Sequence, residues 1–422
     1  MKIVFAGERG RSAPLTWGQR HVLRSADTGV PQVRVVPVPD VPVPRAADAL
    51  ARLVGRHEAL RTRLTGEDEQ RVFESGTLVV ELVRCGPGES MFAAEQARER
   101  LQGPFDHGAE WPLRVALIVP GEFVRHAVLV CSALAVDHDG MDVVATDLAL
   151  LLRGPLPARA APQPVDDARL QRSDHGARLT GRAIRFWTDE LGRLDPVPTH
   201  ERGGRCTATL RSAAMDTAAH AIAGRHGVSA STVYLAATAG LVGSLTGGRV
   251  VGLRTVVSNR FYPDRRDVVA TIAQDGVLVL DVAVPTFSDL VQRAWREAMR
   301  SHRFARYDPD LLANAVTAAP FARFDDTRLT RRDVPALPDE ATLRASALRT
   351  SLTWGERSDR DAFAVLVDGS GVTVRADTGL VSRTDLECWL RALEGLLISA
   401  AYRDVATGEL TALLARTVGP PA

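Results

Sequence analysis

The sequence predicts an α/β protein of two lobes, and three observations support this fold class. The chain has 422 residues, or about 2.8 average domains, which is too long for one small domain. Strand and helix patterns alternate through two halves of similar size. Between the halves, residues 153–174 are rich in Pro and Ala and have no periodicity, so this stretch is the best candidate for a linker.

The composition is that of a soluble globular protein and argues against several functions. Hydrophobic residues make up 45% of the chain and charged residues 24%, which is enough for a sizeable core. The 52 basic and 51 acidic residues leave a net charge of +1, unlike a strongly basic nucleic-acid-binding protein or a polybasic membrane-surface protein. Lys2 is the only lysine, so 51 of the basic residues are arginine.

Cysteine usage and the amino terminus indicate a cytoplasmic protein. We expect neither a disulfide framework nor a zinc site, because no CxxC pair occurs among the four cysteines, which are Cys85, Cys131, Cys206 and Cys388. The amino terminus reaches charged residues after about five apolar ones, too few for a signal peptide. The longest apolar run, residues 127–136, is too short to span a bilayer. We expect no metal and no other cofactor.

The first half contains helical and strand patterns in alternation. Apolar residues recur at helical spacing over residues 46–54, 91–101 and 143–152. Strands are predicted over residues 79–83 and 124–136. The second of these hardly alternates, so we expect it to be buried on both faces. After the linker, a helix over residues 179–194 is expected to bury Trp187.

The second half shows the same alternation without repeating the sequence. Helices are predicted over residues 215–225, 229–245, 287–302 and 384–401. Ser229 or Ser231 caps the second of them, and glycines follow the first two. Strands are predicted over residues 250–257, 277–284, 362–367 and 371–376, with Asp368 and Gly369 in a hairpin turn between the last two.

Several enzyme signatures are absent from the sequence, and four other words stand out. The chain has no GxxxxGK[ST], no GxGxxG after a strand, no HExxH and no GxSxG, so the commoner motif-based enzyme hypotheses lack support. The distinctive words lie at residues 15–20 (LTWGQR), 56–64 (RHEALRTRL), 132–148 and 257–260 (VSNR).

In this order and spacing, the words resemble the condensation-domain superfamily of nonribosomal peptide synthesis. Residues 56–62 contain in full the family's Arg-His-Glu-x-Leu-Arg-Thr motif. Residues 15–19 match the ends of its Leu-Ser-x-x-Gln word, and residues 186–191 match its Tyr-Trp-x-x-x-Leu word. Asn259-Arg260 match the Asn-Arg that ends an early strand of its second lobe, and the whole resemblance covers residues 12–402.

The resemblance implies an α/β fold, an α+β sandwich, in which two chloramphenicol-acetyltransferase-like lobes form a V-shaped pseudo-dimer around a central tunnel. We place the N-terminal lobe at residues 1–165 and the C-terminal lobe at residues 166–422. The chain then resembles a free-standing condensation-like protein without an adenylation or carrier module. The implied partners are an acyl or peptidyl carrier protein with a phosphopantetheine-bound substrate and a small-molecule or peptide acceptor, with no nucleic acid and no membrane.

The family's catalytic motif, His-His-x-x-x-Asp-Gly, is degenerate in this sequence. Its Asp-Gly can be placed on Asp139 and Gly140, which puts Leu134 and Ala135 at the two histidine positions. This alignment needs a two-residue deletion, so we prefer the alternative.

The preferred alignment places the motif's Asp-Gly on Asp137 and His138, and its two histidines on Ser132 and Ala133. It keeps the following helix in register, with residues 147–148 at the family's acidic-Leu pair. In both alignments no histidine occupies the catalytic position. The hydroxyl of Ser132 can still form a hydrogen bond, whereas the methyl group of Ala133 cannot.

Loss of this histidine weakens the catalytic hypothesis and leaves it open. General-base help by a side chain is worth about 10²–10⁴ in rate. An amine that attacks a reactive thioester needs less of this help, because positioning alone supplies roughly 7–11 kcal/mol.

Residues beside the degenerate motif are candidates for a replacement role. His138 lies at a strand-to-helix turn between Asp137 and Asp139, where it is either a catalytic or ligand-binding group or a loop histidine held by these acids. The family's motif Asp is usually structural and pairs with an Arg of the second lobe. The resemblance therefore implies a structural pair of Asp137 with Arg260, the alternative being a direct catalytic role for Asp137.

The resemblance also assigns residues to the tunnel. Gln274 replaces the Asn of a family segment, and both Gln274 and Trp354 fall in segments that line the tunnel, as substrate wall or as core. Trp17 and Gln19 are expected to pack at the mouth of the first lobe. Ser132 is the further candidate for substrate contact.

Three functional hypotheses stay open on the sequence. The first is an acyltransferase of natural-product biosynthesis that moves a carrier-bound acyl group to an amine or hydroxyl acceptor without the usual histidine. The second is a catalytically inactive condensation-like module that recruits tailoring enzymes or carrier proteins. The third is a condensation-fold enzyme with altered chemistry, such as cyclisation or dehydration, driven by Asp137, His138 or a substrate group. A carrier protein is acidic, so some of the 51 arginines are candidates for its docking surface.

Overall fold

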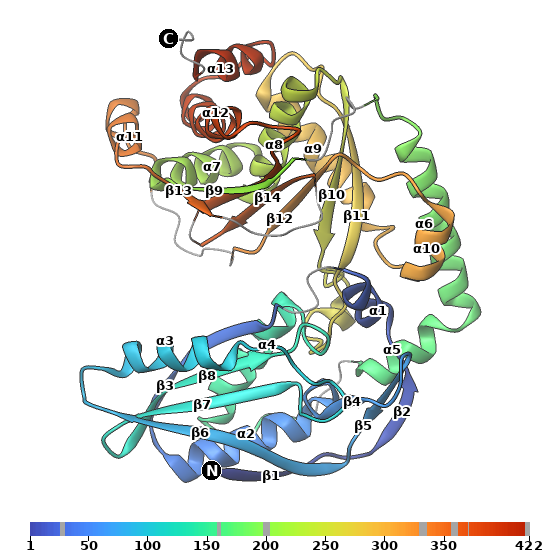
Figure 1. Cartoon of the computed structure of the whole chain (residues 1–422), viewed down its shortest axis with the longest axis vertical. Helices are drawn as coiled ribbons and strands as arrows, with labels where there is room; N and C mark the ends of the chain where they lie inside the picture. Colours follow the sequence, from blue (N-terminus) through green and yellow to red (C-terminus); the bar gives the residue numbers. More distant parts are fainter. Residues whose placement is uncertain are drawn as a thin grey trace. The chain divides into compact units, whose positions relative to one another are not determined.

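The chain groups into two compact units (Figure 1). The computed structural model describes residues 1–25, 30–157, 162–196, 203–328, 336–355, 362–369 and 371–417. Unit 1 consists of Met1–Gly181, Ser258–Gln274 and Arg306–Ala313, and unit 2 of Arg182–Val257, Asp275–Ala305 and Asn314–Ala422. The predicted domain boundary at residues 165/166 and the V-shaped arrangement of the lobes stay predictions.

Two sheets form the strand framework of unit 1. The larger has the order β1-β6-β7-β8-β3, and its strands are β1 (Lys2–Ala6), β3 (Gln32–Pro42), β6 (Ser75–Cys85), β7 (Leu113–Pro120) and β8 (Phe123–Cys131). Only β6 and β7 pair in parallel among these described strands. The smaller sheet has the order β2-β5-β4, formed by Arg11–Pro14, Glu69–Val72 and Thr62–Leu64.

Helices cover both faces of the larger sheet of unit 1. α2 (Val43–Arg56) and α4 (His138–Leu151) share a core with one face, and α3 (Ser90–Leu101) packs on the other. Successive residues of β8 alternate between these cores: Ala127 and Leu129 belong to the first, Val128 and Val130 to the second. The expectation of a strand buried on both faces is therefore confirmed for β8. The other helices described here are α1 (Trp17–Arg24), α5 (Pro164–Gln171), α10 (Pro309–Ala315) and the 3-10 turns Glu58–Arg61 and Pro263–Arg265.

The structure corrects two sequence-based expectations in unit 1. The strand predicted over residues 124–136 ends at Cys131, because the carbonyl of Ser132 accepts hydrogen bonds from the N–H groups of Ala135 and Val136 and so closes a turn. The predicted linker contains a helix, α5. Its first residue is Pro164, which suits the first helical position, and its start lacks the apolar periodicity that would have predicted it. Residues 158–161 of the predicted linker lie outside the described residues.

A seven-stranded sheet forms the framework of unit 2, in the order β11-β10-β12-β14-β15-β9-β13. Its strands are β9 (Arg205–Arg211), β10 (Val250–Val257), β11 (Gln274–Asp281), β12 (Ala322–Asp326), β13 (Ser351–Gly355), β14 (Phe363–Asp368) and β15 (Gly371–Asp377). β10, β12 and β14 run parallel, whereas β14, β15, β9 and β13 pair antiparallel.

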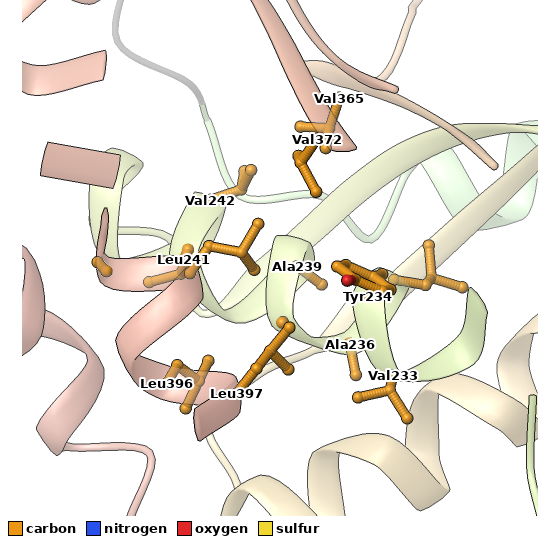
Figure 2. Packing of buried hydrophobic residues seen from close by; sticks show 14 of the residues in the cluster. Val233, Tyr234, Ala236, Ala239, Leu241, Val242, Val365, Val372, Leu396 and Leu397 are labelled. Carbon is orange, nitrogen blue, oxygen red and sulfur yellow. The ribbon is translucent and has the colours of Figure 1, made fainter. Parts of the chain in front are cut away.

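The core of unit 2 is built around α8 (Ala230–Thr246), whose residues 232–243 are all buried. The hydroxyl of Ser229 caps its first turn, and Gly247 ends it in the left-handed conformation that glycine adopts without strain. In Figure 2 its side chains lie between Val365 and Val372 of the sheet and Leu396 and Leu397 of α12. The other helices are α6 (Asp174–Leu191), which belongs to unit 2 from Arg182 on, α7 (Ala213–His226), α9 (Phe287–His302), α11 (Glu340–Ala347), α12 (Arg383–Tyr402) and α13 (Glu409–Thr417).

Within the described ranges no single helix is long and apolar enough to cross a membrane; α7 and α8 pass that test of length and composition only together, as a pair bent by 105°.

The segment Ser258–Gln274 packs tightly against α1 in unit 1. A Cβ atom added at Gly18 would lie 1.9 Å from the carbonyl oxygen of Thr271, which is closer than two non-bonded atoms can approach. Glycine at this position therefore allows the helix to touch the backbone of the incoming segment.

We expect Gly18→Ala to destabilise the protein by about 1–3 kcal/mol, because helix and segment must move apart to admit the methyl group. Gly66→Ala is the matched control, since a Cβ there meets no atom within 4 Å. It should keep the stability or raise it by less than about 1 kcal/mol. Urea unfolding of both variants measures the effect, and equal stabilities would show that the contact is not tight.

Candidate functional site

Residues 132–140, where the sequence predicts the degenerate motif, form a turn between β8 and the start of α4 in unit 1. The hydroxyl of Ser132 accepts a hydrogen bond from the N–H of Leu134 (3.1 Å), which fixes the start of the turn. At its end, Asp137 adopts an extended conformation and caps α4, because its Oδ1 accepts from the N–H of Gly140 (2.9 Å).

The carboxylate of Asp137 forms a buried, two-pronged ion pair with Arg260. Nη2 of Arg260 lies 2.6 Å from Oδ1, and Nη1 donates to Oδ2 at 2.9 Å. Each residue is only 8% exposed. A planar guanidinium matches a carboxylate in this geometry, so the pair fixes orientation as well as charge.

Further backbone donors saturate the Asp137 carboxylate. Oδ2 also accepts from the N–H groups of Ile272 (2.9 Å) and Ala273 (3.0 Å). Together with Gly140 and Nη1 of Arg260, four hydrogen-bond donors converge on two oxygens, which offer about four lone-pair positions, and Nη2 of Arg260 adds an ion-pair contact. Asp137 therefore has no lone pair left for a substrate proton, and its geometry is that of a structural group.

The segment that carries Arg260 is held in place on both sides of the arginine. Asn259 has a positive φ of 57°, which asparagine tolerates better than most residues. Its side-chain amide donates to the carbonyl of Ile272 (2.9 Å). Gly140 leaves room for the arginine, because a Cβ there would lie 2.9 Å from Nη2 of Arg260.

Ala133 is the residue that the preferred alignment places at the second histidine of the family motif. The residue is half-buried, and its carbonyl accepts from the hydroxyl of Thr271 (2.5 Å). The backbone of this position is thus fixed, while its side chain has no group that can transfer a proton.

His138 is the first residue of α4, and its ring lies beside Arg34 of β3. Nη2 of Arg34 is 3.4 Å from Nδ1 and 3.3 Å from Nε2, and Nε of Arg34 donates to Asp142 (2.7 Å). Among the described residues, no hydrogen bond joins the ring to Asp137 or Asp139. A guanidinium carries only donors, so the imidazole nitrogen that faces it acts as an acceptor.

Asp139 lies in the first turn of α4 and is half-buried. Its carboxylate has no hydrogen-bond donor among the residues that the structure describes. Burial, and after it the negative charge of Asp137, raise the pKa of the Asp139 carboxyl above its ordinary value, and the charge of Arg260 offsets part of this rise. Asp139 is therefore the carboxylate of the motif that is still free to bind a proton.

His107 is a neighbour of the motif that the sequence did not indicate. Its Nδ1 lies 3.4 Å from the hydroxyl of Ser132. Burial lowers the pKa of His107, and the nearby carboxylates of Glu110 and Asp106 offset part of this effect. His107 sits in the loop between α3 and β7, and only the pairing of β7 with β8 brings it to Ser132, so no local pattern could have found it.

The other residues assigned to the tunnel are mostly enclosed by protein. Trp17 is buried, and its backbone N–H donates to Oε1 of Gln171. Gln19 donates to Gln70 (3.0 Å). The buried amide of Gln274 donates to the carbonyl of Tyr307 (2.8 Å) and accepts from its N–H (3.4 Å).

Trp354 belongs to unit 2, whereas Trp17, Gln19 and Gln274 belong to unit 1. It belongs to β13, the edge strand of the unit 2 sheet, and is 39% exposed, with the guanidinium of Arg383 5.6 Å from its ring centre. The structure thus collects one set of candidates in unit 1: Ser132, Ala133, Asp137, His138, Asp139 and Arg260.

The Arg-His-Glu motif (residues 56–58) lies within unit 1. The ring of His57 is fully buried and bonds Asp147 of α4 (2.9 Å), which Arg56 also contacts (3.1 Å). Glu58 is buried and pairs with Arg11 (2.8 Å). The motif therefore joins α2 to α4 and to the small sheet. No cluster of three or more His, Cys, Asp or Glu side chains suited to a metal ion occurs in the described part of the chain.

We expect Asp137→Ala to destabilise the protein by about 3–5 kcal/mol, because it leaves the buried Arg260 charge without its partner. Asp48→Ala is the control, since Asp48 forms an exposed ion pair with Arg52 (2.8 Å) whose loss should cost at most about 1 kcal/mol. Chemical unfolding compares the two. An Asp137→Ala protein as stable as the wild type but inactive would assign Asp137 to the chemistry instead.

Asp139→Asn should stabilise the protein at neutral pH. A raised pKa means that the folded protein binds this proton more tightly than the unfolded chain, so stability falls as the pH rises from the ordinary Asp pKa of about 3.9 through the folded value. The variant should therefore melt at a higher temperature than the wild type at pH 7, with a smaller difference near pH 4.

The control for this pH effect is Asp142→Asn, one turn along the same helix. It removes a carboxylate that is paired with Arg34 and should not raise the melting temperature. A pH-independent difference between Asp139→Asn and the wild type would contradict the assignment.

Comparison with curated proteins gives relatives in natural-product synthesis. The chain is 26% identical over 408 residues to CymA of Salinispora arenicola, described as a "probable non-canonical nonribosomal peptide synthetase", a match that covers 86% of this chain and 5% of CymA. It is 28% identical over 366 residues to the AMB antimetabolite synthetase AmbB of Pseudomonas aeruginosa, covering 81% of this chain and 27% of AmbB. The chain thus spans a small part of each relative. No protein-family model matches the sequence.

Solved structures of the same fold include three from biosynthetic systems. The condensation domain of the monacolin K polyketide synthase MokA superposes with a TM-score of 0.71 and 17% identity, covering 94% of this chain and 99% of that domain. A condensation domain for chain release from the enacyloxin polyketide synthase gives 0.69 and 17%, covering 97% and 84%. The X-domain of teicoplanin biosynthesis, in its complex with OxyB, gives 0.64 and 21%, covering 96% and 97%.

These likenesses confirm the predicted fold class. The chain has the fold of the condensation domains of nonribosomal peptide and polyketide synthesis, and its curated relatives are synthetases of natural-product biosynthesis.

Proposed function

We propose that the protein is a condensation-like acyltransferase of natural-product biosynthesis that works in the cytoplasm without the usual catalytic histidine. It takes an acyl group from the phosphopantetheine thioester of a carrier protein and transfers it to an amine or hydroxyl acceptor. The observation that supports this most is the intact scaffold of the motif. The ion pair of Asp137 with Arg260 and the backbone donors around it hold the turn in place, although the histidine itself is replaced by Ala133.

The reaction needs one proton to move between the two reactants. The amine nitrogen forms a bond with the thioester carbonyl carbon, the C–S bond breaks, and the thiolate leaves. The proton that the amine loses ends on this thiolate, which restores a neutral thiol. A base near the turn speeds the step by holding the proton in transit.

Asp139 is the group that we propose for this proton. Its carboxylate is unpaired among the described residues, half-buried and raised in pKa, which suits a general base better than a fully solvated Asp. His138 is the second candidate, but its ring already accepts from Arg34. Gln274, Trp17 and Ser132 stay candidates for substrate contact in the predicted tunnel.

A recruiting module is the second candidate function. Two observations favour it: Ala133 has no functional group, and the X-domain that shares this fold is found in a complex with OxyB. In such a module the intact turn would serve stability alone. An altered chemistry, the third hypothesis, would use the same Asp139 or His138 on a bound substrate.

The test is incubation with carrier-bound acyl donors and amine acceptors, followed by intact-mass analysis of the carrier and of the product. We expect product with the wild type, a loss of about 10²–10⁴ in rate for Asp139→Asn and a smaller loss for His138→Ala. Asp139→Asn should be slower although it is more stable, which separates a chemical role from a structural one. If His138→Ala lowers the rate more than Asp139→Asn does, His138 rather than Asp139 is the group that accepts the proton.

Ala133→His distinguishes the enzyme from the recruiting module. If the turn still lies next to a substrate-binding space, restoring the imidazole should raise the condensation rate, by up to about 10²–10⁴. Ala145→His changes another half-buried alanine, on α4 and outside both alignments of the motif; it is the matched control and should not raise the rate. No product with wild type or with Ala133→His, from proteins that are folded, would reject acyl transfer and favour recruitment.

A further inference from the structure

Unpaired arginines gather on two helices of unit 2. Arg182 and Arg185 are exposed on α6, and Arg296 and Arg303 are exposed on α9 and at its end. None of these four forms an ion pair with any residue that the structure describes. Arg293, by contrast, pairs with a carboxylate at the end of β11 from the same helix α9.

The two helices present these arginines on one surface. Arg300 of α9 pairs with the buried Glu190 of α6, and its guanidinium lies 5.3 Å from the ring centre of Phe186. Arg182 of α6 lies 5.7 Å from the ring centre of Phe304, just after α9. α6 is the long helix drawn in green in Figure 1.

The α6–α9 basic surface has a clear excess of positive charge. It consists of Arg182, Arg185, Arg193, Arg296, Arg300 and Arg303. Three carboxylates lie among them: Asp189, Glu190 and Glu297. Arg193 and Arg300 bind Glu190, and Arg300 also binds Glu297. The chain as a whole has a net charge of +1, so this excess is local.

Apolar side chains border the arginines on α9. Trp295 and Met299 are 41% and 42% exposed, and their spacing of four residues places them side by side on the helix. Arg296 lies next to them on the same exposed face. Trp, Met and Arg are enriched at protein interfaces, where an aromatic or apolar anchor adds to charge attraction.

We propose that the α6–α9 basic surface docks a small acidic protein, which under the proposed function is the carrier that delivers the acyl thioester. Unpaired guanidinium groups fit carboxylates on a partner and speed its approach. The exposed Trp295 and Met299 favour a protein over a free polyanion, which would have no use for an apolar contact. Only the identity of the partner rests on the proposed function.

The test uses the double variant R185E/R296E and measures binding of an acidic, phosphopantetheine-bearing carrier protein. The control R211E/R349E changes the charge equally at two exposed arginines on β9 and after α11, which also have no ion pair among the described residues. At low salt we expect R185E/R296E to slow association at least ~10-fold, and the control to slow it less than ~2-fold. The difference should shrink at high salt.

Trp295→Ala gives a second, charge-independent measurement. It should raise the dissociation rate at least ~5-fold at any salt concentration, because it removes an apolar anchor rather than a charge. Equal carrier binding by wild type, R185E/R296E and Trp295→Ala would overturn the proposal. Equal binding of a short DNA duplex and of the carrier would also overturn it, since the surface would then attract any polyanion.

A small soluble thioester of the same acyl group separates this proposal from the proposed function. R185E/R296E should use the small thioester as fast as the wild type, because that donor needs no docking surface. Wild type that uses the small thioester but binds no carrier would overturn docking and leave acyl transfer in place. Wild type that binds the carrier through this surface but converts neither donor would overturn acyl transfer and leave docking in place.

Discussion

The geometry of the candidate site depends on keeping the charge of Asp137 buried. Removing a carboxylate from water costs several kcal/mol unless donors replace the lost hydration. Four hydrogen-bond donors do so here, and they come from three places: the first turn of α4, the guanidinium of Arg260, and the backbone at Ile272 and Ala273. The turn before α4 is therefore held by a contact with Arg260, more than 120 residues away in the sequence. This contact fixes the position of the side chains on the turn.

This arrangement explains why neighbouring carboxylates differ in what they can do. Asp137 receives all the nearby donors and is saturated. Asp139, two residues on, has no donor of its own among the described residues. Burial, and after it the charge of Asp137, raise the pKa of its carboxyl, so its proton is held more tightly. Two carboxylates on one turn thus differ because one has donors for its buried charge and the other does not, and only the second keeps a capacity to bind a proton.

Much of the fold could be predicted from the local sequence pattern, and the predictions that were wrong have a common cause. The strand over residues 250–257 and the helix over residues 287–302 have the predicted bounds, because period and end signals agree there. The strand predicted through residue 136 was wrong past Cys131, since Leu134 and Val136 are apolar and buried although they lie in a turn. Burial alone does not distinguish a strand from a packed turn. In the site, the motif pointed to Asp137 and Arg260, and these side chains are in contact. The environment of Asp139 and the approach of His107 to Ser132 depend on strand pairing and on distant segments, which no local pattern contains.

The chain order of unit 1 affects how the protein is made. Its first 181 residues leave the ribosome without two of its parts, Ser258–Gln274 and Arg306–Ala313, which are encoded after much of unit 2. At five to twenty residues per second, roughly 7–27 s pass between the synthesis of Asp137 and that of Ile272. During this interval the carboxylate lacks Arg260 and the backbone donors, and the turn beside it has no partner. Unit 1 therefore matures late, after most of its own sequence is complete, and a nascent chain that pauses between these segments exposes the site in an unfinished form.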